Sequence, residues 1–413
     1  MISVAQALEA VLNRVRPRPA EEVPLAAALG RVLAEDVRAS FDIPPFANSQ
    51  MDGFAVRAGD LSGATRAHPV SLDVTGTIAA GASELPAVEP GRAVRIMTGA
   101  PLPPGADAVV KVEDCEVVGS GRQALMFATP RPGEFVRSAG EDVAAGDLVL
   151  EQGRRLRPAD VGMLAGLGRA VVNVASRPRV AVLTTGDELV SPGRALGPGQ
   201  IYNSNAYVLA AAVAEVGAEP VVLGTVRDER SALGAALRAA TDFDVALTTG
   251  GVSVGDFDFV KEVMAEIGME RRFWQVAQKP GKPLVFAERD GKLLFGLPGN
   301  PVSALVCFEL YVAPALRRSL GMREVFAGAV EVTMAVAART ARDLTEFVRC
   351  RLERVGDALH AAPTGTQSSG VLRSMSLADC LVVSPPGLAE LAAGSRATAL
   401  VLGGPLSARH PFE

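Results

Sequence analysis

The chain has 413 residues, which is more than one hydrophobic core comfortably serves and favours two to four domains. Its 48% hydrophobic content excludes a disordered chain, and its net charge of -5 disfavours nonspecific binding to nucleic acid, which normally needs a basic surface. Four cysteines without C-x-x-C spacing and three histidines disfavour a zinc site and indicate reduced thiols in a cytoplasmic protein.

The first half of the chain predicts a helix, a β-rich region and a second helix. Residues 1–12 form an amphipathic pattern without the basic start of a targeting segment, and no run of about 18 uncharged apolar residues suggests a membrane span. A short helix is expected at 25–33. Short β-like runs between Gly and Pro turns then fill 51–140, and a helix follows at 158–167.

The second half predicts an α/β domain followed by more strands. Strands near 180, 220, 245, 285 and 293 alternate with helices at 205–216, 229–240, 257–267 and 301–316. This order implies parallel pairing and a three-layer α/β domain. Strands at 330–337, 346–353, 358–362 and 380–384 then predict a second small β-rich domain.

Three of the predicted strands end in polar turns that contain glycine, at 184–188, 249–256 and 296–301. The turns after parallel strands gather at one edge of the sheet, and ligands bind there. Five carboxylates lie on or just after strand ends, and they repel phosphate unless a cation lies between, so they suggest Mg²⁺ bridging to phosphate oxygens. The carboxylates are Asp187, Glu188, Asp228, Asp256 and Asp258. Each alone also fits a helix cap or a solvated turn.

Other turn residues indicate an anionic ligand. Gly250, Gly251 and Gly255 let the backbone approach a ligand closely, and Asn300 and Pro301 suit the start of a helix that faces an anion. Two lysines lie in a loop that prolines and a glycine stiffen, at 278–283. They fit either a solvated turn or a site for a tetrahedral or phosphate-like oxyanion.

Seven runs, in this order and spacing, resemble the molybdopterin molybdenumtransferase family, which inserts molybdate in the last step of molybdenum cofactor synthesis and is homologous to one half of gephyrin. They are NSQMDG at 48–53, RIMTGA at 95–100, GEDV at 140–143, TGDEL at 185–189, TGGVSVGD at 249–256, KPGKP at 279–283 and GLPGNPVS at 296–303.

The resemblance covers nearly the whole chain and implies a multidomain α/β plus β fold. It comprises an elongated split domain at 1–45 and 141–176, an inserted β-rich domain at 46–140, a three-layer α/β domain with a mostly parallel sheet at 177–322, and a C-terminal β-barrel-like domain at 323–413. The N-terminal helix is expected to pack on the α/β domain.

The resemblance also implies an enzyme that transfers molybdate into adenylated molybdopterin, with Mg²⁺ and release of AMP. The implied catalytic residues are Asp52, Thr98, Asp142, Glu188, Asp228, Asp258, Lys279 and Lys282. The implied residues for the pterin nucleotide are Thr185, Gly186, Asp187, Gly250, Gly251, Ser253, Gly255, Pro298, Gly299, Asn300 and Pro301. Mg²⁺ is assigned to Glu188, Asp228, Asp256 and Asp258, and molybdate to Lys279, Lys282, Arg349, Ser369 and Ser374.

The implied assembly is a cytoplasmic homodimer with a composite site, in which Asp52, Thr98 and Asp142 face the partner subunit. The adenylyltransferase of the preceding step and molybdoenzyme maturation factors are further expected partners, whereas a membrane and nucleic acid are not. Two alternatives stay open. The first is that the chain is the adenylyltransferase of the preceding step, although that enzyme lacks the flanking β-domains. The second is a non-catalytic, gephyrin-like scaffold, against which the full carboxylate and lysine set argues.

Overall fold

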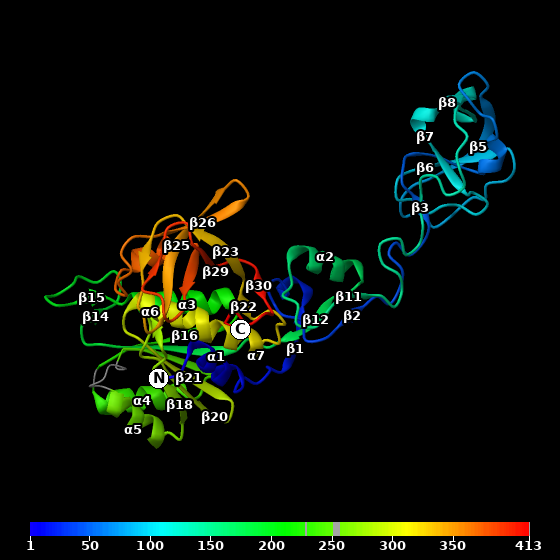
Figure 1. Cartoon of the computed structure of the whole chain (residues 1–413). Coiled ribbons are helices and arrows are strands. Elements are labelled where there is room, and N and C mark those ends of the chain that lie inside the picture. Colours follow the sequence, from blue (N-terminus) through cyan, green and yellow to red (C-terminus); the bar gives the residue numbers. More distant parts are fainter. Residues whose placement is uncertain (228, 251–256, 413) are drawn as a thin grey trace. The chain divides into compact units, whose positions relative to one another are not determined.

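The computed structural model describes residues 1–227, 229–250 and 257–412, without the side chains at 230 and 257–261 (Figure 1). Two compact units have separate hydrophobic cores. The larger unit comprises Met1–Glu35, Gln152–Arg157 and Val172–Glu413, and the smaller comprises Asp36–Glu151 and Pro158–Val171. None of the helices within the described ranges is long and apolar enough to cross a membrane.

A six-stranded sheet forms the centre of the larger unit. Its order is β16 (Glu219–Val226), β13 (Arg179–Thr185), β17 (Val245–Thr249), β21 (Lys292–Leu297), β20 (Val285–Arg289) and β18 (Glu270–Trp274). The first four strands are parallel, β20 runs antiparallel to β21, and β18 runs antiparallel to β20. Because β13, β17 and β21 are apolar runs buried along almost their whole length, they suit a sheet covered on both faces.

Helices cover both faces of this sheet, which confirms the three-layer prediction (Figure 1). On one face lie α4 (Arg230–Ala240) and α5 (Phe257–Glu266). On the other lie α3 (Ser204–Val216) and a continuous helical segment, made of α6 (Pro301–Cys307), a π-helical turn (Phe308–Val312) and α7 (Ala313–Ser319). The N-terminal α1 (Val4–Leu12) adds its apolar face to the same core and packs on α7 and the π-helical turn.

Two local features differ from the sequence-based expectations. The helix expected at 25–33 is wrong, because only Leu25–Ala27 forms a 3-10 turn and Gly30 then takes a φ of +74°. The edge strand β18 was not predicted, since three of its five residues, Glu270, Arg271 and Arg272, are charged.

The C-terminal part of the larger unit is a closed five-stranded barrel, which confirms the barrel-like prediction. Around the barrel run β25 (Thr345–Val355), β26 (Ala358–Pro363), β23 (Ala329–Met334), β29 (Arg396–Val401) and β27 (Cys380–Ser384), and β27 pairs again with β25. The short strand β19 (Gln278–Lys279) joins β25 in parallel. The helix α8 (Leu372–Ser376) follows a loop at 364–371. These two features bring a loop of the α/β part and a loop of the barrel together.

Four short pairs complete the larger unit. They are β1 (Ala20–Pro24) with β12 (Val171–Ala175), β14 (Leu189–Val190) with β15 (Ile201–Tyr202), β22 (Phe326–Ala327) with β30 (Leu406–Ser407), and β24 (Ala338–Arg339) with β28 (Glu390–Leu391).

The smaller unit is built on a second six-stranded sheet, as the β-rich pattern predicts. Its order is β7 (Ala108–Lys111), β4 (Gly53–Val56), β6 (Arg92–Ile96), β5 (Val70–Ile78), β9 (Gln123–Met126) and β8 (Cys115–Val118). Outside this sheet lie β2 (Val37–Arg38) with β11 (Leu148–Leu150), β3 (Asn48–Ser49) with β10 (Val136–Arg137), and α2 (Pro158–Gly166). Gly53 lies so close to β7 that a Cβ would meet the Val110 carbonyl oxygen at 2.1 Å.

Candidate functional site

A cavity of about 650 Å³ lies at the carboxyl edge of the central sheet, and we call it the sheet-edge cavity. The last residues of β13 and β17, Thr185 and Thr249, line it, together with the turn that precedes α6. The turns that follow three parallel strands therefore meet at one place, as their order predicts. Of the expected nucleotide residues, the cavity brings together Thr185, Gly250, Pro298, Gly299, Asn300 and Pro301, while Gly186 and Asp187 are not part of its lining. Glu188, which was expected as a catalytic residue and Mg²⁺ ligand, also lines it.

The backbone at Gly250 needs a glycine. Its φ is +88°, and a Cβ there would lie 2.5 Å from Thr185 Oγ1. The Thr185 hydroxyl also donates to the Thr249 carbonyl oxygen at 3.4 Å. The ends of β13 and β17 therefore lie in close contact at this cavity.

Two asparagines at the start of α3 connect that helix to the sheet edge. Asn203 caps the helix by accepting from Ala206 N at 3.1 Å, and its Nδ2 donates to Thr184 Oγ1 at 2.8 Å. Asn205 donates to the Gly299 carbonyl oxygen at 2.7 Å. Both line the sheet-edge cavity, and the sequence reasoning missed both. Their Asn-Ser-Asn spacing signals only a helix cap.

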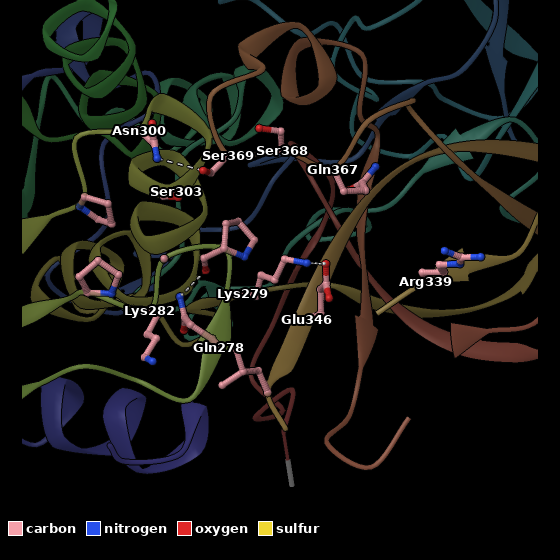
Figure 2. Close-up of a pocket in the computed structure, with 15 residues that line it drawn as sticks. Gln278, Lys279, Lys282, Asn300, Ser303, Arg339, Glu346, Gln367, Ser368 and Ser369 are labelled. Carbon is pink, nitrogen blue, oxygen red and sulfur yellow. Dashed lines mark hydrogen bonds and ion pairs between the residues drawn. The ribbon is translucent and has the colours of Figure 1, made fainter. Parts of the chain in front are cut away.

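A second cavity of about 580 Å³, the lysine cavity, adjoins the first (Figure 2). The two share Pro283, Pro298 and Asn300. The loop at 278–283 forms one wall of the lysine cavity, and the barrel contributes Arg339, Leu344, Glu346, Gln367, Ser368 and Ser369. Lys279, Lys282 and Ser369, which were expected to contact an oxyanion, therefore line one cavity with Arg339 as a third cationic side chain.

The two lysines differ in their partners. Lys279 Nζ lies 3.1 Å from Glu346 Oε1, and Figure 2 shows its side chain reaching toward this carboxylate. Glu346 is 2% exposed, and its other oxygen accepts from Ala341 N at 2.6 Å. Lys282 points away from this pair in Figure 2 and has no ion-pair partner in the described part of the chain. One cation is thus held in place, while the other is free to turn toward a ligand.

A network of hydrogen bonds on the buried side of the lysine loop holds it in place. Gln278, which is fully buried, accepts from the hydroxyl of Tyr311 in the π-helical turn. Its Nε2 donates to the Pro280 carbonyl oxygen at 3.1 Å and to Cys307 Sγ at 3.5 Å. Burial raises the pKa of both Cys307 and Tyr311. Both groups therefore stay neutral and act as hydrogen-bond partners.

Gly281 packs directly against Cys307, a member of this network. Its φ is +88°, and a Cβ would lie 2.5 Å from Cys307 Sγ. The position between the two lysines therefore has no room for a larger residue.

Arg349 lies behind the wall of the lysine cavity, although it was expected to contact molybdate. Its side chain is 1% exposed, and its Nε donates to Ser374 Oγ at 3.0 Å. A terminal nitrogen donates to the carbonyl oxygens of Ser368 and Thr366 at 3.2 and 3.4 Å. Ser374 in turn donates to the Val371 carbonyl oxygen. Arg349 and Ser374 therefore do not line the cavity in this structure. They hold the loop that presents Ser369 to it.

Ser369 also occupies part of the start of α6. Its hydroxyl accepts from Asn300 Nδ2 at 2.9 Å (Figure 2), and its carbonyl oxygen accepts from Val302 N at 3.3 Å. One backbone donor of this helix end is thus already used by the barrel loop.

The smaller unit carries Asp52, Thr98 and Asp142, and all three are exposed. Asp52 Oδ1 accepts from Thr98 N at 2.7 Å and from Thr98 Oγ1 at 2.8 Å. These hydrogen bonds, the backbone one first, hold the pKa of Asp52 below its ordinary value. Asp142 donates its N–H to the Ile43 carbonyl oxygen, and no described hydrogen bond joins it to the Asp52–Thr98 pair. Neither cavity of the larger unit is lined by these three residues.

Several expected residues cannot be placed. Asp228, Gly251, Ser253, Gly255 and Asp256 lie outside the described residues, and the side chain of Asp258 does too, although its backbone lies in the first turn of α5. Of the expected Mg²⁺ ligands, only Glu188 has a described side chain, and it lines the sheet-edge cavity beside Gly186. The described residues contain no group of three or more His, Cys, Asp or Glu that could hold a metal ion.

Three family profiles match the chain in consecutive segments. Residues 2–168 match the MoeA N-terminal region (domain I and II), residues 181–318 match a probable molybdopterin binding domain, and residues 331–402 match the MoeA C-terminal region (domain IV). The chain belongs to the MoeA family.

Full-length MoeA relatives agree with this assignment. "Molybdopterin molybdenumtransferase 2" of Mycobacterium tuberculosis is 40% identical over 408 residues, which cover 96% of this chain and 98% of the relative. "Molybdopterin molybdenumtransferase" of Staphylococcus aureus is 36% identical over 397 residues, covering 95% and 94%. A crystal structure of a MoeA protein from Pyrococcus horikoshii has a TM-score of 0.84 at 35% identity and covers 98% of this chain and 100% of that one.

Within this MoeA chain, the sequence motifs located the strand-end turns and the lysine loop. They did not reveal the residues of other elements that contact the lysine loop, which are Cys307, Tyr311 and Glu346, or the cavity-lining Arg339. These residues carry no local motif, because their roles depend on contacts between distant segments.

Proposed function

We propose that this chain transfers molybdenum into molybdopterin, taking molybdate and adenylated molybdopterin as substrates and releasing AMP. The observation that carries this proposal is the pair of adjoining cavities, in which strand-end turns of a molybdopterin-binding type of domain meet a cationic loop. An adenylyltransferase would need only the α/β part, whereas the family match here extends over both flanking regions.

The sheet-edge cavity suits the pterin nucleotide. Gly250 and Gly299 expose backbone there, and Asn205 and the two threonines offer neutral polar groups. Its walls also include the apolar side chains of Leu189 and Leu372, against which a planar ring packs. A large ligand with both heterocyclic and phosphate parts is consistent with this mixed lining.

The lysine cavity suits molybdate, a tetrahedral dianion. Its cationic side chains attract the anion, and hydroxyls of Ser368 and Ser369 can donate to its oxygens. Glu346 neutralises part of this charge by pairing with Lys279, so Lys282 and Arg339 supply the net positive charge. Arg349 acts by positioning the loop that carries both serines. In the transfer, the two dithiolene thiols form bonds to molybdenum while one molybdate oxygen leaves as water, and a water molecule cleaves the phosphoanhydride, which releases AMP and leaves a phosphate on the pterin.

Mg²⁺ would neutralise the phosphoanhydride of the nucleotide when bound, and Glu188 is the described residue able to hold it. One carboxylate together with phosphate oxygens of the substrate is a common Mg²⁺ environment. We also propose a cytoplasmic homodimer, in which the exposed Asp52, Thr98 and Asp142 complete the partner's site. Their exposure supports this proposal, because it leaves these polar side chains accessible to a second copy of the chain.

The test is AMP release by the purified protein from adenylated molybdopterin, with and without molybdate. Release that depends on molybdate supports the proposal, whereas consumption of ATP to make the adenylate would indicate an adenylyltransferase. Lys282→Ala should lower the rate at subsaturating molybdate about 10- to 100-fold, since a charge-assisted contact contributes about 1.5–3 kcal/mol. Arg396→Ala, at an exposed ion pair on the barrel, is the control. Full activity in Lys282→Ala would contradict the assignment of molybdate to the lysine cavity, whereas no AMP release from the wild type, with or without molybdate, would favour a non-catalytic scaffold.

A further inference from the structure

One atom at the sheet-edge cavity lacks the partner that its burial demands. Asn205, in the first turn of α3, is 8% exposed and lines the cavity. Its Oδ1 is buried and accepts no hydrogen bond from any residue in the described ranges. Buried amide oxygens are normally satisfied, so this one calls for a missing donor.

The orientation of the amide is fixed by its other end. Asn205 Nδ2 donates to the Gly299 carbonyl oxygen at 2.7 Å and to Thr249 Oγ1 at 3.4 Å. A carbonyl oxygen only accepts, so the nitrogen must face Gly299 and the oxygen must face the remaining direction. Rotating the amide would not satisfy it, because two oxygens would then oppose each other.

Asn203 provides an internal comparison two residues earlier. Its Oδ1 accepts from Ala206 N, and its Nδ2 donates to Thr184 and Thr225. That side chain is satisfied at both ends within the protein, as a purely structural asparagine should be. Asn205 is satisfied at its donor end alone, which separates a ligand-directed role from a structural one.

The chemistry of the free atom restricts what it can recognise. An amide oxygen accepts a hydrogen bond and cannot stabilise a phosphate or molybdate oxygen. Beside it the cavity has apolar walls from Leu189, Ile201 and Leu372. We propose that Asn205 Oδ1 accepts from an amino group on the planar heterocycle bound in this cavity and so determines which rings bind. This inference rests on the proposed function, since adenylated molybdopterin carries two such rings, a pterin and an adenine.

The experiment compares ligand pairs that differ by one group. AMP is compared with IMP, and 6-hydroxymethylpterin with the corresponding lumazine, because in each pair an oxygen replaces the amino group. Binding is measured on the full-length protein by competition in the AMP-release assay. For the ring that contacts Asn205, the wild type should prefer the amine about tenfold or more, and Asn205→Ala should remove this preference. The pair that responds identifies the ring.

Variants separate this role from folding. Asn203→Ala should weaken both members of a pair equally, because it loosens the start of α3 without changing the recognised group. Asn205→Asp keeps an oxygen acceptor but sets its second oxygen against the Gly299 carbonyl oxygen, so it should bind both members of a pair more weakly while retaining the preference for the amine. An equal preference in wild type and Asn205→Ala for both ring pairs would overturn the inference while leaving molybdate-dependent AMP release intact. Absence of that AMP release in the wild type would instead overturn the proposed function, and this inference with it.

Discussion

The hydroxyl of Tyr311 is the point at which the core should control the lysine loop. Tyr311→Phe removes one oxygen and keeps the ring, so the buried Gln278 Oε1 loses its hydrogen bond without a large void. An unsatisfied buried acceptor costs about 1–3 kcal/mol of unfolding free energy. The freed amide is then held only through its Nε2 contacts to Pro280 and Cys307, and the loop between the lysines loosens.

The effect of Tyr311→Phe on molybdate binding follows from the same energy scale. If the looser loop misplaces Lys279 and Lys282 so that molybdate binding loses about 1 kcal/mol, the KM for molybdate should rise about fivefold. The kcat should change little, because Tyr311 touches no reacting atom. The assay is the rate of AMP release against molybdate concentration, combined with urea unfolding followed by fluorescence of the single Trp, Trp274.

Phe308→Leu is the matched control for Tyr311→Phe. Phe308 belongs to the same π-helical turn and is equally buried, but its side chain cannot hydrogen-bond to the loop. Phe308→Leu should cost about 1 kcal/mol of stability and leave the KM for molybdate unchanged. If Tyr311→Phe lowers stability by the same amount and also leaves this KM unchanged, the network supports only the core.

Three further outcomes follow from the same contacts. Glu346→Gln should lower the KM for molybdate severalfold, because it releases Lys279 from its ion pair; a higher KM would mean that Glu346 positions the lysine for binding. Gly281→Ala should destabilise the larger unit by about 2 kcal/mol or more, because φ is +88° and a Cβ would crowd Cys307, and unchanged thermal unfolding would contradict this. Thr98→Val should raise the pKa of Asp52 only part of the way to its ordinary value, because the backbone hydrogen bond remains, and a carboxyl NMR titration measures it. Since this pKa is lowered by folding, the pair stabilises the smaller unit at neutral pH, and that contribution is lost as pH falls through the folded-state pKa.

The sequence predicted those parts of the fold that have a local pattern. The apolar runs of β13, β17 and β21 and their glycine turns were sufficient to predict a parallel sheet with a ligand edge. The charged edge strand β18 was not recognisable, because its position is set by pairing with β20 and not by its own composition.

The site was predictable only where one segment supplies it. Lys279 and Lys282 share a loop, but the side chains that fix this loop come from other elements, such as Tyr311, which lies 33 residues beyond its partner Gln278. Arg349 shows the converse, because the family resemblance implied a ligand contact, whereas in the fold its guanidinium donates to loop carbonyl oxygens. Side-chain direction in such cases is decided by packing between distant segments.

The most direct test of the account is to locate the metal oxyanion in crystals of this protein grown with molybdate. Anomalous scattering at the molybdenum edge identifies the atom without assumptions about its ligands. The account predicts a peak in the lysine cavity, within contact of Lys282 and the loop that carries Ser368 and Ser369. A fully occupied peak elsewhere, with the lysine cavity empty, would contradict it.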